Sequence, residues 1–178
     1  MAAILITGRP GSGKTTLVRT VIEQLGARAG GFYTRETRGD DGRRTGFEIV
    51  TLSGETARLA GVDITGPQGV GHYGVDIEAL ERVAVPALEA AIESDALVVV
   101  DEIGKMELLS ARFQRALVEC YRRHRLLFGT IMQAAHPFAD ELKGQPDTLL
   151  FELTESSRDE VRGLVEAQLL AALGRLSV

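Results

Sequence analysis

The stretch GRPGSGKT occupies residues 8–15 and matches every position of the pattern G-x-x-x-x-G-K-[ST]. Its members are Gly8, Arg9, Pro10, Gly11, Ser12, Gly13, Lys14 and Thr15. An apolar run over 2–7 predicts a buried strand before it, and the pattern over 14–25 predicts a helix behind it. Such a turn aims backbone N–H groups and the positive end of the helix dipole at phosphate oxygens. The stretch therefore predicts a phosphate-binding loop that holds a nucleoside triphosphate.

Three side chains at the start of this helix have distinct expected roles. Lys14 is expected to reach the β- and γ-phosphates, where it also serves catalysis, and the hydroxyl of Thr15 is expected to ligate Mg²⁺. Thr16 follows directly and completes the predicted nucleotide-binding segment. Mg²⁺ is thus the expected cofactor.

The second half of the predicted site follows an apolar run, ALVVV, at residues 96–100. This run predicts a buried strand, and Asp101 and Glu102 come directly after it. An acidic residue at the end of a buried strand, combined with a phosphate-binding loop upstream, indicates the carboxylate that organises Mg²⁺ opposite Thr15. Asp101 is therefore the second predicted metal ligand.

Glu102 is predicted to orient or deprotonate the water that attacks the γ-phosphate, although an incidental surface charge is the alternative. Lys105 could neutralise charge in the transition state or be merely solvated. Glu107 is expected to be a charge at the start of a helix rather than a catalytic group. The predicted second nucleotide segment comprises Val98, Val99, Val100, Asp101, Glu102, Ile103, Gly104 and Lys105.

Other residues are open alternatives. Thr130 or Gln133, after the next expected strand, could sense the γ-phosphate or the water, because ligands in α/β sheets lie at the carboxyl ends of strands. Arg9, Arg35 and Arg122 are the candidates for an arginine finger, and the sequence does not choose among them. The cluster RRHR at 122–125 is expected at a helix end, where cations suit the helix dipole.

The rest of the chain alternates between strand and helix patterns. Strands are expected at 30–36, 45–51, 56–60, 126–131 and 148–153, and helices at 76–94, 110–123, 137–143 and 157–173. The turn signal GDDG at 39–42 joins two strands into an inserted antiparallel hairpin, and the glycine-rich segment 61–74 is expected to be a long mobile loop. The pattern predicts one α/β domain over 1–178, with a mostly parallel sheet covered by helices on both faces.

Composition narrows the function classes. The chain has 178 residues and a net charge of −5, so nothing favours nucleic acid or an anionic membrane as a partner. Cys120 is the only cysteine and lies at the apolar spacing of a helix, which predicts a core position and no disulfide framework. No apolar stretch is long enough for a membrane span, and the N-terminus has no charged region of the signal-peptide kind. These features predict a cytoplasmic protein; any protein partner is unknown.

Several segments together resemble the nucleoside-triphosphatase family described from thermophiles, which has a human cancer-related relative. The resemblance rests on ITGRPGSGKTTL, GGFYTRE, RTGFEIV, GHYGVDIEALERVAVPALEAA and above all VVVDEIGKMEL. It implies a P-loop NTPase fold and slow, Mg²⁺-dependent hydrolysis of ATP, GTP, CTP and UTP to diphosphate and phosphate. Broad base tolerance agrees with the absence of an Asn-Lys-x-Asp run. One departure is Met132, where the resemblance leads us to expect proline after Thr130 and Ile131.

Two competing functions remain at the sequence level. A small-molecule or nucleoside kinase would share the size and the loop, but the glycine-rich segment 61–74 has no arginine or lysine of the sort that lids over acceptors carry. A nucleotide-dependent switch or interaction module is the third possibility, with the hairpin over 30–51 and the glycine-rich segment 61–74 as its partner surfaces. Glu102 beside Asp101 is the feature that favours the hydrolase.

Overall fold

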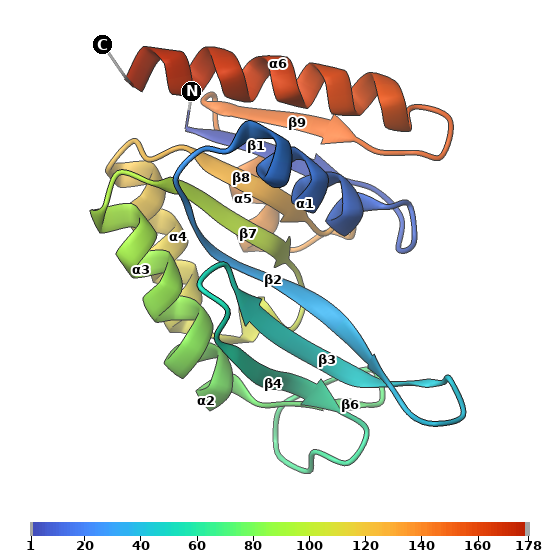
Figure 1. Cartoon of the computed structure of the whole chain (residues 1–178). Helices are drawn as coiled ribbons and strands as arrows, with labels where there is room; N and C mark the ends of the chain where they lie inside the picture. The colour runs from blue at the N-terminus through green and yellow to red at the C-terminus, as the bar shows by residue number, and fades with distance from the viewer. Residues whose placement is uncertain (1, 177–178) are drawn as a thin grey trace.

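The fold is built around one mixed sheet with helices on both sides, as the computed structural model of residues 2–176 shows (Figure 1). The strands are β1 Ala3–Thr7, β2 Ala29–Arg38, β3 Arg44–Thr51, β4 Thr56–Gly61, β5 Gly69–Val70, β6 Tyr73–Val75, β7 Leu97–Ile103, β8 Leu127–Ile131 and β9 Thr148–Glu152. The helices are α1 Lys14–Leu25, α2 Ile77–Ala79, a π-helix at Leu80–Ala84, α3 Val85–Glu93, a 3₁₀ helix at Glu107–Leu109, α4 Ala111–Arg122, α5 Pro137–Lys143 and α6 Arg158–Leu176.

The sheet has a parallel core and an antiparallel extension. Its order is β5-β6-β4-β3-β2-β7-β8-β1-β9. The pairs β2–β7, β7–β8, β8–β1 and β1–β9 are parallel, whereas β3, β4, β6 and β5 add on in antiparallel fashion beyond β2. The strand β8 lies between β1 and β7, so the glycine-rich loop after β1 and the carboxylates of β7 meet at one edge of the sheet, across the end of β8.

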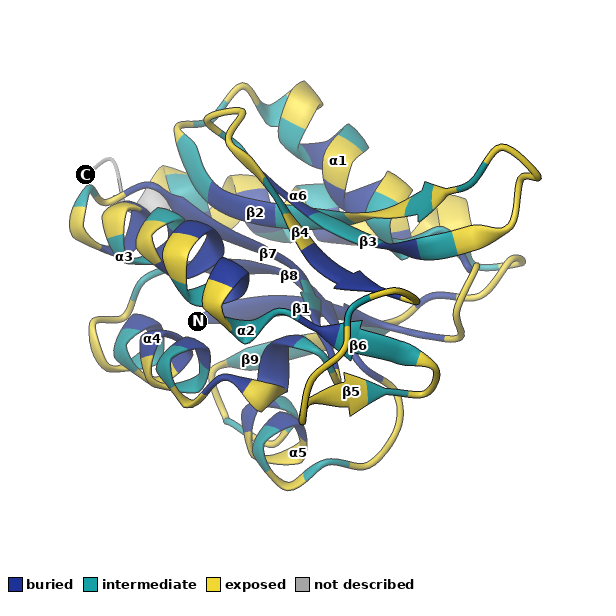
Figure 2. Cartoon of the chain, turned by 90° about the horizontal axis from the view of Figure 1, so that it is seen from below, coloured by how far each residue is buried: buried dark blue, intermediate teal, exposed yellow. Residues whose placement is uncertain are grey.

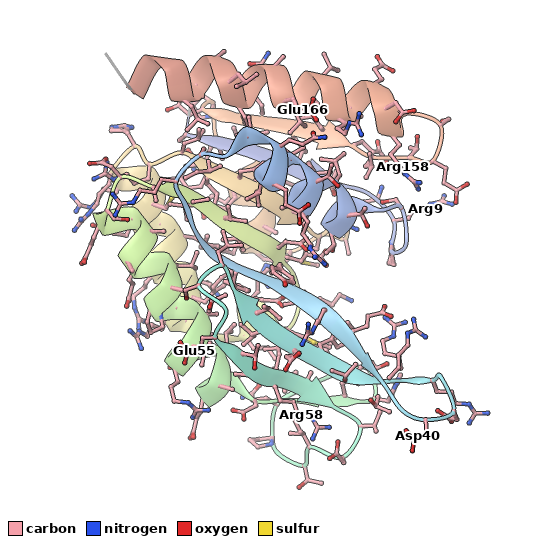
Figure 3. All side chains as sticks on the ribbon, viewed as in Figure 1. Arg9, Asp40, Glu55, Arg58, Arg158 and Glu166 are labelled. Carbon is pink, nitrogen blue, oxygen red and sulfur yellow. The ribbon has the colours of Figure 1, made fainter. Side chains whose placement is uncertain are left out.

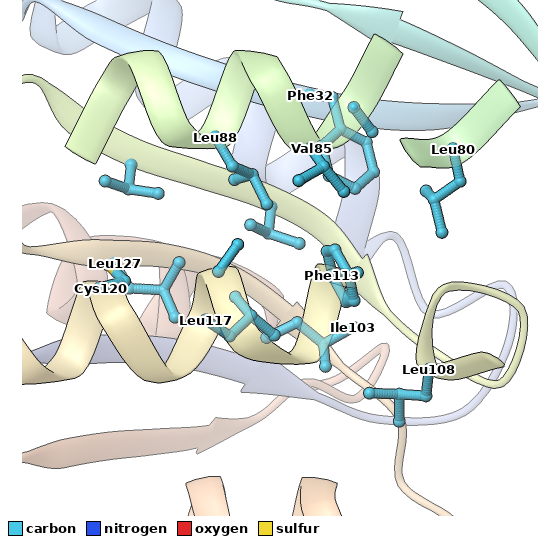
Figure 4. Close-up of a cluster of buried hydrophobic side chains, with 14 of the residues drawn as sticks. Phe32, Leu80, Val85, Leu88, Ile103, Leu108, Phe113, Leu117, Cys120 and Leu127 are labelled. Carbon is cyan, nitrogen blue, oxygen red and sulfur yellow. The ribbon is translucent and has the colours of Figure 1, made fainter. Parts of the chain in front are cut away.

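Two apolar layers fix the sheet between its helices. Alternate residues of β1 and β7 face opposite sides, as the period of a strand requires. Val98 and Val100 pack toward α3 and α4, whereas Val99 packs toward α1 and α6. Figure 4 shows the first layer, in which the ring of Phe32 meets the ring of Phe113 edge to face at 6.0 Å. Figure 2 shows the buried faces of α3 and α4 turned toward the sheet.

Most of the expected elements are confirmed. The predicted α/β fold with helices on both faces is present, and the expected hairpin is β2 and β3, extended by β4 as anticipated. Ser110 caps α4 by accepting a hydrogen bond from the backbone N–H of Phe113 at 3.0 Å. Cys120 is buried in the core. The expected helix over 76–94 is continuous, running from α2 through the π-helical turn into α3, and Pro86 lies in the first turn of α3 directly after that turn.

Two expectations were wrong. The segment 61–74 is not one long loop, because Gly69–Val70 and the start of Tyr73–Val75 pair as the strands β5 and β6. Within this segment, Gly74 also passes so close to the backbone carbonyl of Ile64 that a side chain at position 74 would collide with it. The strand predicted to end at Val100 continues to Ile103, with consequences for the site.

Candidate functional site

The glycine-rich loop between β1 and α1 takes a conformation that only glycine tolerates at several positions. Gly8 has φ +145° and lies against the carbonyl of Leu153, where any Cβ would collide. Gly13 caps α1 in a left-handed conformation at φ 97°. The Lys14 ammonium folds back over the loop and donates to the carbonyls of Gly8 at 3.0 Å and Arg9 at 3.3 Å. The loop is therefore a curled backbone with a cation at its centre.

The two neighbouring carboxylates lie in an irregularity of β7. Val100 pairs with Gly129 and Ile103 pairs with Ile131, so Asp101 and Glu102 together oppose only Thr130. This two-against-one count is a β-bulge, a device that re-aims side chains. Because of it, Asp101 is buried while Glu102 is only partly buried and reaches the surface of a cavity.

Asp101 is held by the hydroxyl of Thr130. Its Oδ1 accepts a hydrogen bond from Thr130 Oγ1 at 2.6 Å. Burial raises the pKa of Asp101, and the nearby hydroxyls of Thr130 and Thr15 and the charge of Lys14 oppose that rise. Its Oδ2 is buried and has no hydrogen-bond partner within residues 2–176.

This donor set fits Mg²⁺. A divalent magnesium ion prefers oxygen ligands, and a few protein oxygens with phosphate and water complete its shell. An unsatisfied carboxylate oxygen beside the hydroxyl of Thr15 offers that combination. Among the described residues no cluster of three or more acidic, histidine or cysteine side chains offers an all-protein metal cage.

Glu102 lines a cavity of about 420 Å³ together with Lys14 and Lys105. Burial raises the pKa of the Glu102 carboxyl, the positive charge of Lys14 lowers it, and the negative charge of Asp101 raises it further. Lys105 is exposed at the same cavity. The structure thus brings together Lys14, Asp101, Glu102 and Lys105, four side chains of the predicted site.

Other members of the predicted site have different places. The side chains of Val98, Val99, Val100 and Ile103 are fully buried in the two apolar layers, so they support the strand from within. Gly104, Gly8 and Pro10 line the cavity. Gly13 and Thr16 instead line a smaller hollow of about 130 Å³ between α1 and α6.

The candidate sensors after β8 differ in exposure. Thr130 is fully buried, and its hydroxyl donates a hydrogen bond to Asp101. It therefore positions that carboxylate and is not exposed to a phosphate. Gln133 lines the cavity and donates from Nε2 to Glu152 at 3.0 Å. Met132, found where proline was expected, donates its backbone N–H to the carbonyl of Ile103 at 3.0 Å, a bond that proline cannot make.

The three arginine-finger candidates are also placed. Arg35 pairs with Glu48 across the hairpin at 2.6 Å, and Arg122 pairs with Glu119 at 2.7 Å on the exposed face of α4. Arg122 borders a hollow beside Ala2, at the opposite end of β1 from the loop. Arg9 is exposed on the loop itself. Only Arg9 of the three therefore belongs to the loop.

Two residues of the site were missed at the sequence level. Arg158, at the start of α6, donates to the carbonyl of Ser12 at 3.0 Å and lies beside Gly13 (Figure 3). No local motif marks it, because 146 residues separate the partners. Glu107 begins a helix, as expected, but the 3₁₀ helix at Glu107–Leu109 buries it, and burial raises its pKa to about 8, with the charge of Glu102 adding to the rise. The apolar neighbours Leu108 and Met106 were the only signal for that burial.

Comparison with known proteins agrees with this geometry. A family model described as NTPase matches residues 3–165. The chain belongs to this family. The nucleoside-triphosphatase THEP1 of Thermotoga sp. (strain RQ2) is 44% identical to it over 158 residues, which cover 89% of this chain and 90% of that protein. The human cancer-related nucleoside-triphosphatase is 37% identical over 174 residues, and this alignment covers 89% of this chain and 91% of that protein.

The fold of this NTPase-family member matches solved structures as well. The crystal structure of THEP1 from the hyperthermophile Aquifex aeolicus superposes with a TM-score of 0.84 at 37% identity, covering 92% of this chain and 96% of that one. The P-loop NTPase fold expected from the resemblance is thereby confirmed. No helix in the described part of the chain is long and apolar enough to cross a membrane.

Proposed function

We propose that this protein is a Mg²⁺-dependent nucleoside-triphosphate phosphohydrolase that releases nucleoside diphosphate and phosphate. Membership of the NTPase family supports the substrate class. The observation that carries the reaction type is the bulge in β7, which buries Asp101 and leaves Glu102 facing the same cavity as Lys14.

The loop supplies binding and charge compensation. The backbone N–H groups within 8–15 and the N-terminus of α1 suit the β-phosphate. When nucleotide binds, the Lys14 ammonium gives up its hydrogen bonds to the carbonyls of Gly8 and Arg9 and donates to phosphate oxygens instead. Thr15 and the free Oδ2 of Asp101 would hold the magnesium ion. When bound, this ion neutralises charge on the β- and γ-phosphate oxygens.

Glu102 is the proposed general base. Its carboxylate orients the attacking water in line with the bond that breaks and accepts the water's proton. Partial burial makes that carboxylate more basic than a solvated one, which suits proton abstraction near neutral pH. Lys105, at the same cavity, is placed to stabilise charge that develops on the γ-phosphoryl oxygens.

Broad base tolerance and slow turnover are further parts of the proposal. The chain has no Asn-Lys-x-Asp run for reading guanine. Arg35 and Arg122 are engaged in ion pairs away from the loop, and Arg9 alone is left of the three candidates. An arginine finger is worth about 10³- to 10⁵-fold in related phosphoryl transfer, so turnover without one is expected to be slow.

The test is Mg²⁺-dependent phosphate release from ATP, GTP, CTP and UTP. We expect the wild type to hydrolyse all four. Glu102→Gln should bind nucleotide but lose about 10²- to 10⁴-fold in kcat, the usual contribution of a general base. Lys14→Ala should lose binding.

Matched controls are available in the chain. Glu55→Gln removes one exposed carboxylate at a turn, and Lys143→Ala removes an ammonium paired with Asp140 on α5; both should retain activity. Tight nucleotide binding by the wild type without phosphate release would refute the hydrolase proposal. Full activity of Glu102→Gln would refute the assignment of the base.

A further inference from the structure

The cavity that contains Glu102 extends well beyond the phosphate site. It lies between the glycine-rich loop and the antiparallel extension of the sheet, and its volume is about 420 Å³. One side is formed by Gly8, Pro10, Lys14, Glu102, Gly104 and Lys105. The facing wall carries apolar side chains from other elements, namely Phe47, Leu59, Val70, Met106 and Met132.

Hydrolysis alone does not account for this space. The γ-phosphate takes the part of the cavity beside Gly8 and Lys14, and an attacking water adds only about 30 Å³ to it, so neither accounts for the apolar wall on the far side. Small-molecule sites have volumes of about 300–1,000 Å³, with mainly apolar walls and a few placed polar groups. The cavity has that size and that composition.

The apolar wall is fixed by its own contacts. The ring of Phe47 on β3 packs edge to face on Tyr73 of β6 at 5.3 Å, and Leu59 of β4 is fully buried. Met106 and Met132 flank the wall from the 3₁₀ turn and from the end of β8. Thioether sulfurs and a ring edge make favourable contacts with aromatic groups, so the wall suits an aromatic occupant.

Glu107 supplies a polar group in the lining. Its carboxyl accepts the backbone N–H of Gly104, and only 5% of the residue is exposed. Because burial raises its pKa to about 8, Glu107 is protonated at neutral pH and presents an O–H donor in place of a negative charge. An uncharged ligand with a hydrogen-bond acceptor fits such a surface.

We propose that this cavity binds an uncharged aromatic alcohol that replaces water as the acceptor of the γ-phosphoryl group. The hydroxyl oxygen forms a bond to the γ-phosphorus while the bond from that phosphorus to the β,γ-bridging oxygen breaks. The hydroxyl proton passes to Glu102, and the nucleoside diphosphate leaves as the oxyanion. The products are a phosphate monoester and nucleoside diphosphate. The proposal rests on the triphosphate site proposed above; hydrolysis is the reaction of water when the acceptor is absent.

The test uses arylmethanols as probes: benzyl alcohol, the three hydroxymethylpyridines and 2-naphthylmethanol, each compared with its methyl analogue that lacks the hydroxyl. Saturation-transfer NMR in the presence of a non-hydrolysable triphosphate reports binding. Transfer of ³²P from γ-labelled ATP to the alcohol reports the reaction. We expect binding and monoester formation from at least one probe, and binding without transfer from its methyl analogue.

Two valine variants locate the site. Val70→Asp places a charge on the apolar wall at a partly exposed position and should weaken probe binding at least about 10-fold. Val62→Asp makes the same change just beyond β4, outside the cavity, where the side chain is 52% exposed, and should leave probe binding and phosphate release unchanged. Lys14→Ala should abolish monoester formation.

The outcomes separate this inference from the hydrolase proposal. Phosphate release without binding of any probe overturns the acceptor site while the hydrolase stands. Binding of the alcohols without any ³²P transfer also overturns it, as does equal loss of binding in the two valine variants. Transfer to an alcohol without phosphate release in its absence would support the acceptor site and refute hydrolysis as the principal reaction.

Discussion

At the residue scale, the site contains three carboxyl groups that differ in burial and in their hydrogen-bond partners. Asp101 is buried with one oxygen held by Thr130, Glu102 faces the cavity, and Glu107 is buried behind it. Burial raises the pKa of each, but only Asp101 has hydroxyl donors that favour its charged form. The hydroxyls therefore favour Asp101, among the three carboxyls, as the proposed metal ligand.

Thr130 is expected to be a positioning residue for the metal. Thr130→Val keeps the shape but removes the hydrogen bond to Asp101 Oδ1, so the carboxylate loses its fixed orientation. Loss of such a supporting contact typically costs about 10- to 100-fold in metal affinity. Titration calorimetry of Mg²⁺ into the protein with a non-hydrolysable triphosphate would measure it. Thr130→Ser should restore the affinity, and unchanged affinity in the valine variant would contradict the role.

Glu107 is expected to make stability depend on pH. Its pKa rises from 4.5 in the unfolded chain to about 8 in the folded one, so between these values only the folded chain holds the proton. The free energy of unfolding contributed by this group therefore falls as pH rises from 4.5 to about 8, by at most about 1.4 kcal/mol per pH unit.

Denaturant unfolding between pH 5 and pH 9, without Mg²⁺, tests this dependence. The stability of the wild type relative to Glu107→Gln should decrease from pH 5 to about pH 8 and then level off, because glutamine has no proton to lose. Glu55→Gln, at an exposed turn, should show no such trend relative to the wild type. A wild-type advantage that does not change with pH would rule out the raised pKa.

The sequence was sufficient for side chains adjacent to a motif and insufficient for those placed by folding. Lys14, at the start of α1, meets Asp101 and Glu102 of β7 because β1, which leads into the loop before Lys14, and β7 run parallel and end at the same edge of the sheet, as the order of elements predicts. Arg158 reaches the loop across 146 residues, and the burial of Glu107 depends on the wall built around it. Neither follows from local pattern.

At the element scale, the least predictable feature is the irregularity of β7. The apolar run ALVVV suggested a strand that ends before Asp101, because charged side chains are seldom found inside a buried strand. The strand instead continues to Ile103 and tolerates the carboxylates through a bulge. The short hairpin of β5 and β6 was missed for a related reason, since glycine-rich segments predict turns whether or not they pair.

The contact between α6 and the glycine-rich loop is expected to tune nucleotide affinity. Arg158→Ala removes the hydrogen bond to the carbonyl of Ser12, leaving the loop less ordered before nucleotide binds. A net loss of about 1 kcal/mol, or about 5-fold in nucleotide affinity, is the expected size for one such bond. Arg162→Ala, one turn further along α6 and paired with Glu166, is the matched control. Equal affinities for the two variants would contradict the role of Arg158.

At the scale of the whole molecule, the parallel core and the antiparallel extension contribute different parts of the site. The core holds the loop and the carboxylates at its edge, while β3, β4 and β5 contribute the apolar wall of the cavity. A site built from both parts links nucleotide binding to the stability of the entire fold, because the loop, β7 and β8 all pack into the two central apolar layers.

Nucleotide with Mg²⁺ is therefore expected to stabilise the whole chain against heat. A ligand at about 100 times its Kd adds about 2.7 kcal/mol, and a domain of this size gains about 2–4 °C per kcal/mol, so Tm should rise by about 5–10 °C with a non-hydrolysable triphosphate. Chelating Mg²⁺ should remove much of that rise, since the buried Asp101 then faces the phosphates without an intervening cation. Differential scanning calorimetry of wild type, Lys14→Ala and Lys143→Ala would separate specific from general effects. Lys14→Ala should show almost no rise and Lys143→Ala the full one, whereas a rise in wild type that survives chelation unchanged would refute the proposed metal site.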